Sequence, residues 1–320
     1  MINQMKRLAA ATLVATALLG LAAPVQAEFP EKPVEMTVLF GGTANSTAQI
    51  LADTMSDALG GTVVPVSRTG GGGAVGYSFV NGTAPDGYNI VFNSNSINTS
   101  HHTGKIPFDY TAFAPIARIS VEVPALGVNP SSGWKSLAEM KAAVARMDGT
   151  IKVGISGKGA FTHLVSAALF DAMGLSDKVT FISYGKGKAP VELLAGRIDA
   201  AIQWPGQFAS YVESGDLDVL AVTGAERVDL LPDVPTAKEA GVDINITMWR
   251  GLAAPAGTPK EVIAKLEAAA KAAVNSAAFQ DASGKIGFTP AFMDAEDFGA
   301  LIARDDKFYG DLLARLGLSG

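Results

Sequence analysis

The sequence predicts an α/β protein made of two α/β lobes with a ligand cleft between them. Short apolar segments alternate with segments of helical periodicity, which indicates βαβ units around parallel sheets. The alternation forms two blocks, and two extended stretches, Val121–Val128 and Ile246–Ala254, flank the second block. We interpret these stretches as paired crossovers between lobes. Residues 28–124 and 250–320 would then form the first lobe, and residues 125–249 the second.

The first block begins with strand and helix segments that are easily told apart. The segment Asn45–Leu59 places its apolar residues at helical spacing on one face, and the segment Gly73–Gly82 begins with glycine. The expected strands are Met36–Phe40, Val63–Val66 and Ile90–Asn93, and the expected helices are Asn45–Leu59 and Gly73–Gly82.

The middle block repeats this alternation. Ser136 and Glu139 form a capping box, which predicts a helix that runs to Met147. Further helices are expected at Phe161–Met173 and Ala189–Ala195, and strands at Ile151–Ile155, Val179–Ile182, Asp199–Gln203 and Asp218–Val222.

The C-terminal part is predicted to be helical. Thr258 and Glu261 have the spacing of a capping box, and Pro259 is expected at the first helical position. Asp294 is the expected N-cap of the last helix. Both helices carry apolar residues on one face, so we expect the tail to return and complete the first lobe.

Residues 1–27 have the features of a secretory signal peptide. Lys6 and Arg7 precede an apolar run, and Val25-Gln26-Ala27 is a small-x-small site that predicts cleavage after Ala27. A membrane anchor is the alternative, but the run is shorter than the ~20 apolar residues of a spanning helix. We therefore expect a soluble periplasmic protein.

The composition excludes several classes of function. The net charge is −6 at pH 7, and removal of Lys6 and Arg7 makes it more negative. Nucleic-acid binding needs clustered basic residues, so no nucleic-acid partner is expected. The chain has no cysteine, which excludes thiol catalysis, disulfides and a lipid-anchored N-terminal cysteine.

The first candidate loop follows the first predicted strand and begins at residue 40. Gly42 lets backbone N–H groups approach a ligand, and Thr43, Asn45 and Ser46 add hydroxyl and amide groups at a helix N-terminus. Asn and Ser are also preferred N-cap residues, so plain helix capping is the alternative.

The second candidate loop contains the pattern GxGxxG. Gly71, Gly73 and Gly76 lie between a strand and a helix, which is the context of a dinucleotide site. No acidic residue ends a following strand at the required distance, because Asp86 lies in a predicted turn. The loop is therefore expected to pack a helix tightly on the sheet, and no cofactor is predicted.

The third candidate loop precedes the helix at Phe161. It nearly matches GxSxG, but Lys158 replaces the final glycine, so a nucleophile elbow is not expected. Its N–H groups, including those near Ala160, together with Ser156 and Thr162, suit a carboxylate at a helix N-terminus.

The histidines do not form an obvious catalytic or metal site. His163 follows Thr162 in the first helical turn, where a lone histidine is more often structural, although it is kept as a ligand candidate. His101 and His102 are adjacent, so their side chains diverge and a metal site is not expected. A secreted hydrolase or a dinucleotide enzyme would need groups that the sequence does not supply.

The fourth candidate region begins at Tyr184. Tyr184 and Trp204 offer flat walls for a carbon skeleton or could belong to the core, and Lys186 could meet an anion or be solvated. Asn93 and Gln203 end predicted strands, at the edge where ligands of open α/β sheets bind.

Seven motifs, in order along the chain, resemble the Bug-type binding proteins of tripartite tricarboxylate transporters. They are Phe-Pro-x-Lys-Pro-Val at 29–34, Phe-Gly-Gly at 40–42, the glycine-rich 70–76, Ala-Pro-Asp-Gly-Tyr at 84–88, Gly-Lys-Gly-x-x-Thr-His-Leu at 157–164, Leu-Pro-Asp-Val-Pro-Thr at 231–236 and Trp-Arg-Gly-Leu at 249–252.

The resemblance implies a type II periplasmic-binding-protein fold without enzymatic activity. It implies a monomer that closes on a small carboxylate, either a di- or tricarboxylate or an aromatic acid, and delivers it to membrane permease subunits. The implied contacts are Gly42, Thr43, Asn45 and Ser46 in the first lobe and Ser156, Ala160, Phe161 and Thr162 in the second. The family usually has Asp and Arg where this chain has Asn45 and Gln49, which makes an amino-acid ligand less favourable.

Overall fold

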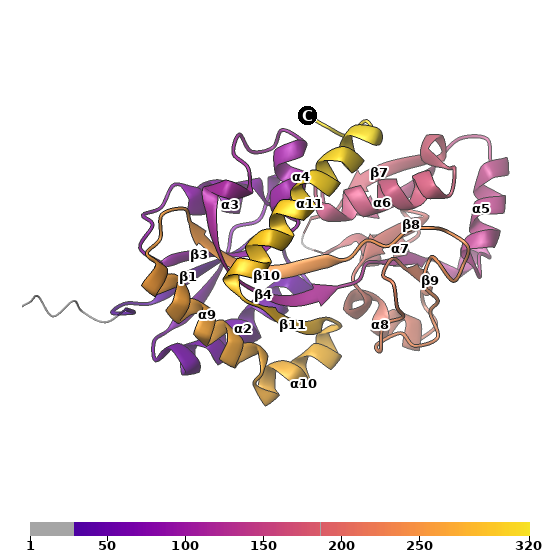
Figure 1. Ribbon diagram of the computed structural model, residues 1–320. Coiled ribbons are helices and arrows are strands. Elements are labelled where there is room, and N and C mark those ends of the chain that lie inside the picture. The colour runs from indigo at the N-terminus through magenta and orange to yellow at the C-terminus, as the bar shows by residue number, and fades with distance from the viewer. Residues whose placement is uncertain (1–28, 186) are drawn as a thin grey trace, which may run out of the picture. The chain divides into compact units, whose positions relative to one another are not determined.

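The computed structural model describes residues 29–185 and 187–320, and its strands form two sheets (Figure 1). The predicted signal peptide and Lys186 lie outside the described residues. Within the described part, the first sheet has six strands in the order β11-β4-β10-β3-β1-β2. These are β11 (Thr289–Met293), β4 (Phe113–Glu122), β10 (Met248–Pro255), β3 (Asn89–Ser94), β1 (Val34–Val38) and β2 (Val63–Ser67).

The first sheet combines a parallel half with an antiparallel half. β1 pairs in parallel with β2 and β3, whereas β10 pairs antiparallel with β3 and β4. Helices that connect or follow these strands are α2 (Thr43–Leu59), α3 (Ala74–Asn81), α4 (Ser96–His102), α9 (Lys260–Val274), α10 (Ala277–Ile286) and α11 (Ala295–Arg315).

The second sheet has the order β7-β6-β8-β5-β9 in the described residues. β6 pairs in parallel with β7 and β8, and β5 pairs antiparallel with β8 and β9. The strands are β5 (Ala125–Val128), β6 (Ile151–Ile155), β7 (Val179–Ser183), β8 (Ala200–Gln203) and β9 (Asp218–Val222), and the helices are α5 (Leu137–Arg146), α6 (Phe161–Ala172), α7 (Ala189–Leu194) and α8 (Pro205–Glu213).

Two of the predicted helix caps are confirmed, and the third is wrong. Ser136 accepts the N–H of Glu139, and Asp294 accepts the N–H of Asp297, as predicted. The capping box at Thr258 is wrong, because Pro259 has extended geometry and is itself the N-cap of α9. The Thr258 hydroxyl instead donates to the carbonyl of Pro255 at 2.8 Å.

The chain passes between the sheets at two neighbouring places. One is the short link from β4 to β5, and the other is the segment from β9 to β10. Thr223 joins both links: its N–H donates to Pro124 O at 2.9 Å, and its hydroxyl donates to Ile246 O at 2.7 Å. The lobe boundaries stay a prediction, but these hydrogen bonds tie the two passages together.

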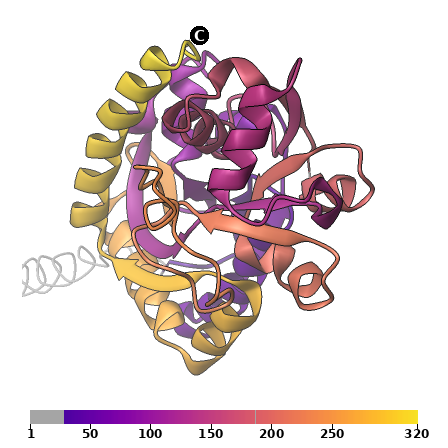
Figure 2. The ribbon, with the colours of Figure 1, turned by 90° about the vertical axis from the view of Figure 1, so that its right-hand side faces the viewer.

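α11 packs against the cores of both lobes. Phe298 and Ile302, in its first half, belong to the apolar cluster of the first sheet. Tyr309, Leu312 and Leu313, in its second half, belong to the cluster of the second sheet. Figures 1 and 2 show this yellow helix running along one side of both sheets. None of the helices in the described part of the chain has the length and apolar character needed to span a bilayer.

Candidate functional site

Loops that follow strands of both sheets line a cavity of about 460 Å³. The first sheet contributes the loops after β1, β2 and β3, and the second contributes those after β6, β7 and β8. All of these loops lie at the carboxyl ends of strands, the usual position of ligand sites in open α/β sheets. The volume falls within the range of small-molecule sites, about 300–1,000 Å³.

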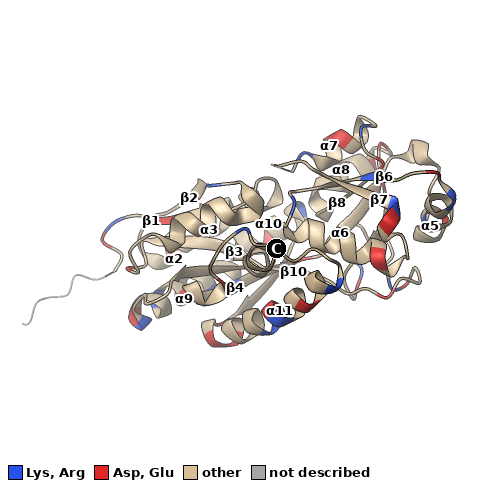
Figure 3. Ribbon diagram, turned by 90° about the horizontal axis from the view of Figure 1, so that it is seen from above, with Lys and Arg blue, Asp and Glu red and all other residues tan. Residues whose placement is uncertain are grey.

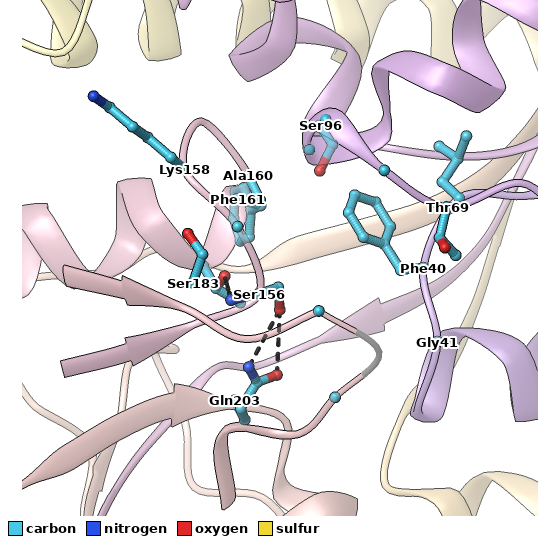
Figure 4. Close-up of a pocket in the computed structure, with 18 of the residues that line it drawn as sticks. Phe40, Gly41, Thr69, Ser96, Ser156, Lys158, Ala160, Phe161, Ser183 and Gln203 are labelled. Carbon is cyan, nitrogen blue, oxygen red and sulfur yellow. Dashed lines mark hydrogen bonds between the residues drawn. The ribbon is translucent and has the colours of Figure 1, made fainter. Parts of the chain in front are cut away.

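The N-terminus of α6 opens into this cavity. Its N-cap, Ala160, makes no side-chain capping hydrogen bond, and Ala160, Phe161 and Thr162 all line the cavity (Figure 4). The first N–H groups of a helix have no partner within the helix, and they lie at the positive end of its dipole. This helix end can therefore hold an anion without a charged side chain.

Ser156, Thr162 and Gln203 form a polar network on the second-lobe wall. The N–H of Ser156 donates to Thr162 Oγ1 at 2.9 Å. The Gln203 amide donates to Ser156 Oγ at 3.2 Å, as the dashed lines of Figure 4 show. Because the Thr162 hydroxyl is an acceptor in this network, its own hydrogen stays available to a ligand.

His163 holds the loop before α6 and does not line the cavity. The ring is buried, and its Nδ1 accepts the N–H of Gly159 at 3.2 Å. Burial, with a smaller effect from the Lys158 charge, lowers the pKa of His163 to about 4. The imidazole is therefore neutral at neutral pH, which fits a structural role.

We expect His163 to make the protein less stable in acid. Its pKa is lowered in the folded state, so the unfolded state binds more protons between pH 6.5 and 4, and stability falls as pH falls through this window. The expected loss between pH 7 and 5 is about 2 kcal/mol. Thermal unfolding against pH measures it: His163→Gln should flatten the slope relative to the parent. An unchanged slope in His163→Gln would contradict the assignment.

A buried ion pair on two neighbouring strands of the first sheet borders the cavity. Arg250, on β10, lines the cavity and is bound by Glu122 of β4 through Nε–Oε1 at 2.6 Å and Nη2–Oε2 at 3.1 Å. Both side chains are 1% exposed. The guanidinium also lies 5.6 Å from the ring centroid of Trp204, which is another lining residue.

The backbones of the two lobes come close at three places beside the cavity. A Cβ on Gly72 would lie 3.4 Å from Ala160 N, and one on Gly187 would lie 3.4 Å from the Cα of Gly42. A Cβ on Gly206 would lie only 1.8 Å from the carbonyl oxygen of Ile286. The first two distances are ordinary van der Waals contacts, whereas at position 206 only glycine lets the lobes approach this closely.

The structure separates the first-loop candidates from the cavity lining. Phe40 and the next residue line the cavity, whereas Gly42, Thr43, Asn45 and Ser46 are outside the lining in the described residues. Gly42 is the N-cap of α2 with φ of 67°, and no side chain caps the helix, so capping by Asn45 or Ser46 does not occur. For these four residues, ligand contact stays a prediction.

Two further candidates have structural partners outside the lining. Asn93 is buried, and its Oδ1 accepts the Tyr77 hydroxyl at 2.8 Å. Tyr184 packs against the apolar cluster that contains Phe208. Of the predicted ligand residues, the cavity brings together Ser156, Ala160, Phe161, Thr162 and Gln203.

The sequence does not identify six of the lining residues: Leu39, Ser96, Lys105, Gln207, Met248 and Arg250. Arg250 could have been noticed as one charge in an otherwise apolar segment, a pattern that indicates a paired buried charge. Ser96 follows a polar run, and Gln207 lies between Gly206 and Phe208; in neither case does a local pattern distinguish a ligand contact from a surface residue.

The cavity differs in charge from the rest of the protein. Acidic and basic residues are interspersed along the outer helices, α11 among them (Figure 3). Among the described lining residues, the charged ones are Lys105, Lys158 and Arg250, and none is acidic. The site is therefore suited to an anion although the chain as a whole is acidic.

Residues 47–318 match the model of the tripartite tricarboxylate transporter family receptor, TctC. The chain belongs to this family. The resemblance to Bug-type binding proteins is thus confirmed, and TctC receptors are binding proteins rather than enzymes. BugT of Bordetella pertussis is a TctC relative, 29% identical over 98% of each chain.

Solved structures support the two-lobe fold of this TctC receptor. The periplasmic binding protein BugD is 29% identical and superposes with a TM-score of 0.85 over 91% of this chain and 99% of that one. A Rhodopseudomonas palustris protein solved with adipate is 25% identical, with a TM-score of 0.85 over the same shares of the two chains. The predicted fold class, two α/β lobes of the periplasmic-binding-protein kind, is confirmed.

Proposed function

We propose that this protein is a soluble, monomeric periplasmic receptor that captures a small carboxylate and delivers it to the permease of a tripartite tricarboxylate transporter. The observation that carries the proposal is the cavity at the uncapped N-terminus of α6, whose described lining has no acidic side chain. A desolvated carboxylate needs several hydrogen-bond donors, and this helix end supplies them.

The related structures support a carboxylate as the ligand. The R. palustris relative was solved with adipate, a dicarboxylate, and shares the fold over nearly its whole length. BugD is described as a periplasmic protein, which agrees with the predicted export of this chain. Family membership supports delivery to permease subunits, since the matched family is defined as a transporter receptor.

A binding screen on the purified protein tests the proposal. Thermal shift with small carboxylic acids should raise the unfolding temperature, because a ligand at ~100 times its Kd adds about 2.7 kcal/mol of stability. The corresponding amides and amines are the matched controls, since they lack the negative charge. If the controls stabilise the protein as much as the acids, the carboxylate assignment is wrong.

Replacement of Thr162 tests how the anion is held. Thr162→Val keeps the shape and removes the hydroxyl, so affinity for a bound acid should fall about tenfold, the size of one hydrogen bond to a charged group. Because this hydroxyl also accepts the Ser156 N–H, Thr162→Ser is the matched control that should retain affinity. Titration calorimetry on both variants measures the difference. If Thr162→Val binds as tightly as the parent, the Thr162 hydroxyl does not contribute to ligand binding.

Export should be accompanied by cleavage after Ala27. The basic start, the apolar run and the Val25-Gln26-Ala27 ending carry this expectation. Mass spectrometry of the protein recovered from the periplasm should give a chain that begins at Glu28. Recovery of a membrane-bound chain that retains Met1 would refute both the cleavage and the soluble location.

A further inference from the structure

The inner part of the cavity offers few free charges for a ligand with several carboxylates. Among the described lining residues, Arg250 is the buried cation, and its Nε and Nη2 are both engaged by Glu122. Lys105 and Lys158 are exposed, and Figure 4 shows the Lys158 side chain extending away from the other labelled residues. The α6 N-terminus can hold one carboxylate, but a second desolvated carboxylate would meet no unpaired buried cation.

Apolar side chains from both lobes form the walls beside this anion site. Phe40 comes from the first lobe, and Figure 4 shows its ring projecting into the space opposite Phe161. Phe161 is fixed from behind by an edge-on contact with Tyr309 at 5.7 Å between ring centroids. Trp204 and Met248 extend the apolar surface. Such walls suit a flat carbon body, because aromatic rings pack face to edge or offset against one another.

Ser96 Oγ and Gln207 Oε1 are the buried side-chain atoms of the described lining that have no hydrogen-bond partner. Ser96 lines the cavity from the first lobe, is 1% exposed, and its Oγ lacks a hydrogen-bond partner in the described residues. Figure 4 shows the Ser96 hydroxyl directed toward the space above Phe40. Buried hydroxyl groups are normally hydrogen-bonded, so this atom calls for a polar group on the ligand.

We propose that the cavity selects a monocarboxylic acid with an aromatic body that bears a hydroxyl group, and that Ser96 binds this hydroxyl. The inference rests on the proposed function and narrows it. The carboxylate lies at the N-terminus of α6, the ring packs between Phe40 and Phe161, and the hydroxyl pairs with Ser96 Oγ. Because a site that hydrogen-bonds a hydroxyl rejects the analogue that lacks it, Ser96 determines specificity.

Titration calorimetry with five probes tests the proposal: benzoate, 3-hydroxybenzoate, 4-hydroxybenzoate, adipate and citrate. At least one hydroxybenzoate should bind about tenfold more tightly than adipate, citrate and benzoate. Ser96→Ala should weaken that hydroxybenzoate about tenfold and change benzoate less than about twofold. Ser210→Ala, an exposed serine on α8 outside the lining, is the matched control and should change neither.

Each of the other outcomes shows whether this inference or the proposed function itself is wrong. If adipate or citrate binds more tightly than every aromatic acid, the aromatic class is overturned and the carboxylate receptor stands. If Ser96→Ala weakens benzoate and the hydroxybenzoate equally, the assignment of Ser96 is overturned. If neither these five probes nor the wider panel of acids binds, the proposed function itself fails.

Discussion

Glu122→Gln is expected to lower the free energy of unfolding by about 3–5 kcal/mol, the usual cost of breaking a buried ion pair from one side. The variant keeps the size of the side chain but leaves the Arg250 guanidinium without its counter-charge at a position that is 1% exposed. Since β4 and β10 are neighbours in the first sheet, the unpaired charge lies inside the sheet contact. Urea denaturation of parent and variant measures the loss.

The double variant Glu122→Leu with Arg250→Met is the control. It removes both charges and retains most of the volume, so it should be clearly more stable than Glu122→Gln, because well-packed apolar pairs often replace buried ion pairs without loss. Parent-like stability in Glu122→Gln would mean that Arg250 is compensated by another group. The double variant also tests the anion site: if it still binds acids, the guanidinium charge is not what holds them.

The parallel parts of both sheets were predictable from the sequence because their signals are local. β6 begins and ends at the predicted residues, β2 and β7 begin at the predicted Val63 and Val179, and α6 begins at the predicted Phe161. In βαβ units, a strand and its following helix are close in sequence, so periodicity and caps are sufficient to place them.

The antiparallel half of the first sheet was not predictable in the same way. β4, β10 and β11 were missed as sheet strands, and β10 was seen only as an extended crossover. β10 lies between β3 and β4, which are more than a hundred residues away in sequence, and all of its residues are buried. A strand buried on both faces shows no alternation of polar and apolar residues, so its position depends on long-range pairing.

The candidate site likewise contains residues that a local sequence pattern identifies and residues that only tertiary packing brings to the cavity. The second-lobe residues Ser156 and Thr162 were found because a glycine-rich loop before a helix is a local pattern for anion binding. Ser96, Gln207 and Arg250 reach the cavity only through the packing of separate chain segments. Their contribution depends on where the lobes meet, which no local pattern encodes.

Gly206→Ala is expected to weaken ligand binding by about ten- to a hundredfold, because overpacking of close contacts costs about 1–3 kcal/mol. The new Cβ would lie 1.8 Å from the carbonyl oxygen of Ile286, so the lobes could not approach as closely as they do in this structure. Within α8 the change is favourable, since alanine has a higher helix propensity than glycine. Stability of the unliganded protein should therefore change little while affinity falls.

Gly284→Ala provides the matched control for this experiment. Gly284 lies in α10, close to Ile286 in sequence, and a Cβ there would meet no atom within 4 Å. It should bind like the parent, so a loss of affinity specific to Gly206→Ala reports on the contact between the lobes. Calorimetry gives the affinities, and small-angle scattering with a saturating acid should show a more extended Gly206→Ala protein. If Gly206→Ala binds and scatters like the parent, close approach of the lobes at this point is not required for capture, and the paired crossovers at Pro124 and Ile246 would not act as a hinge for binding.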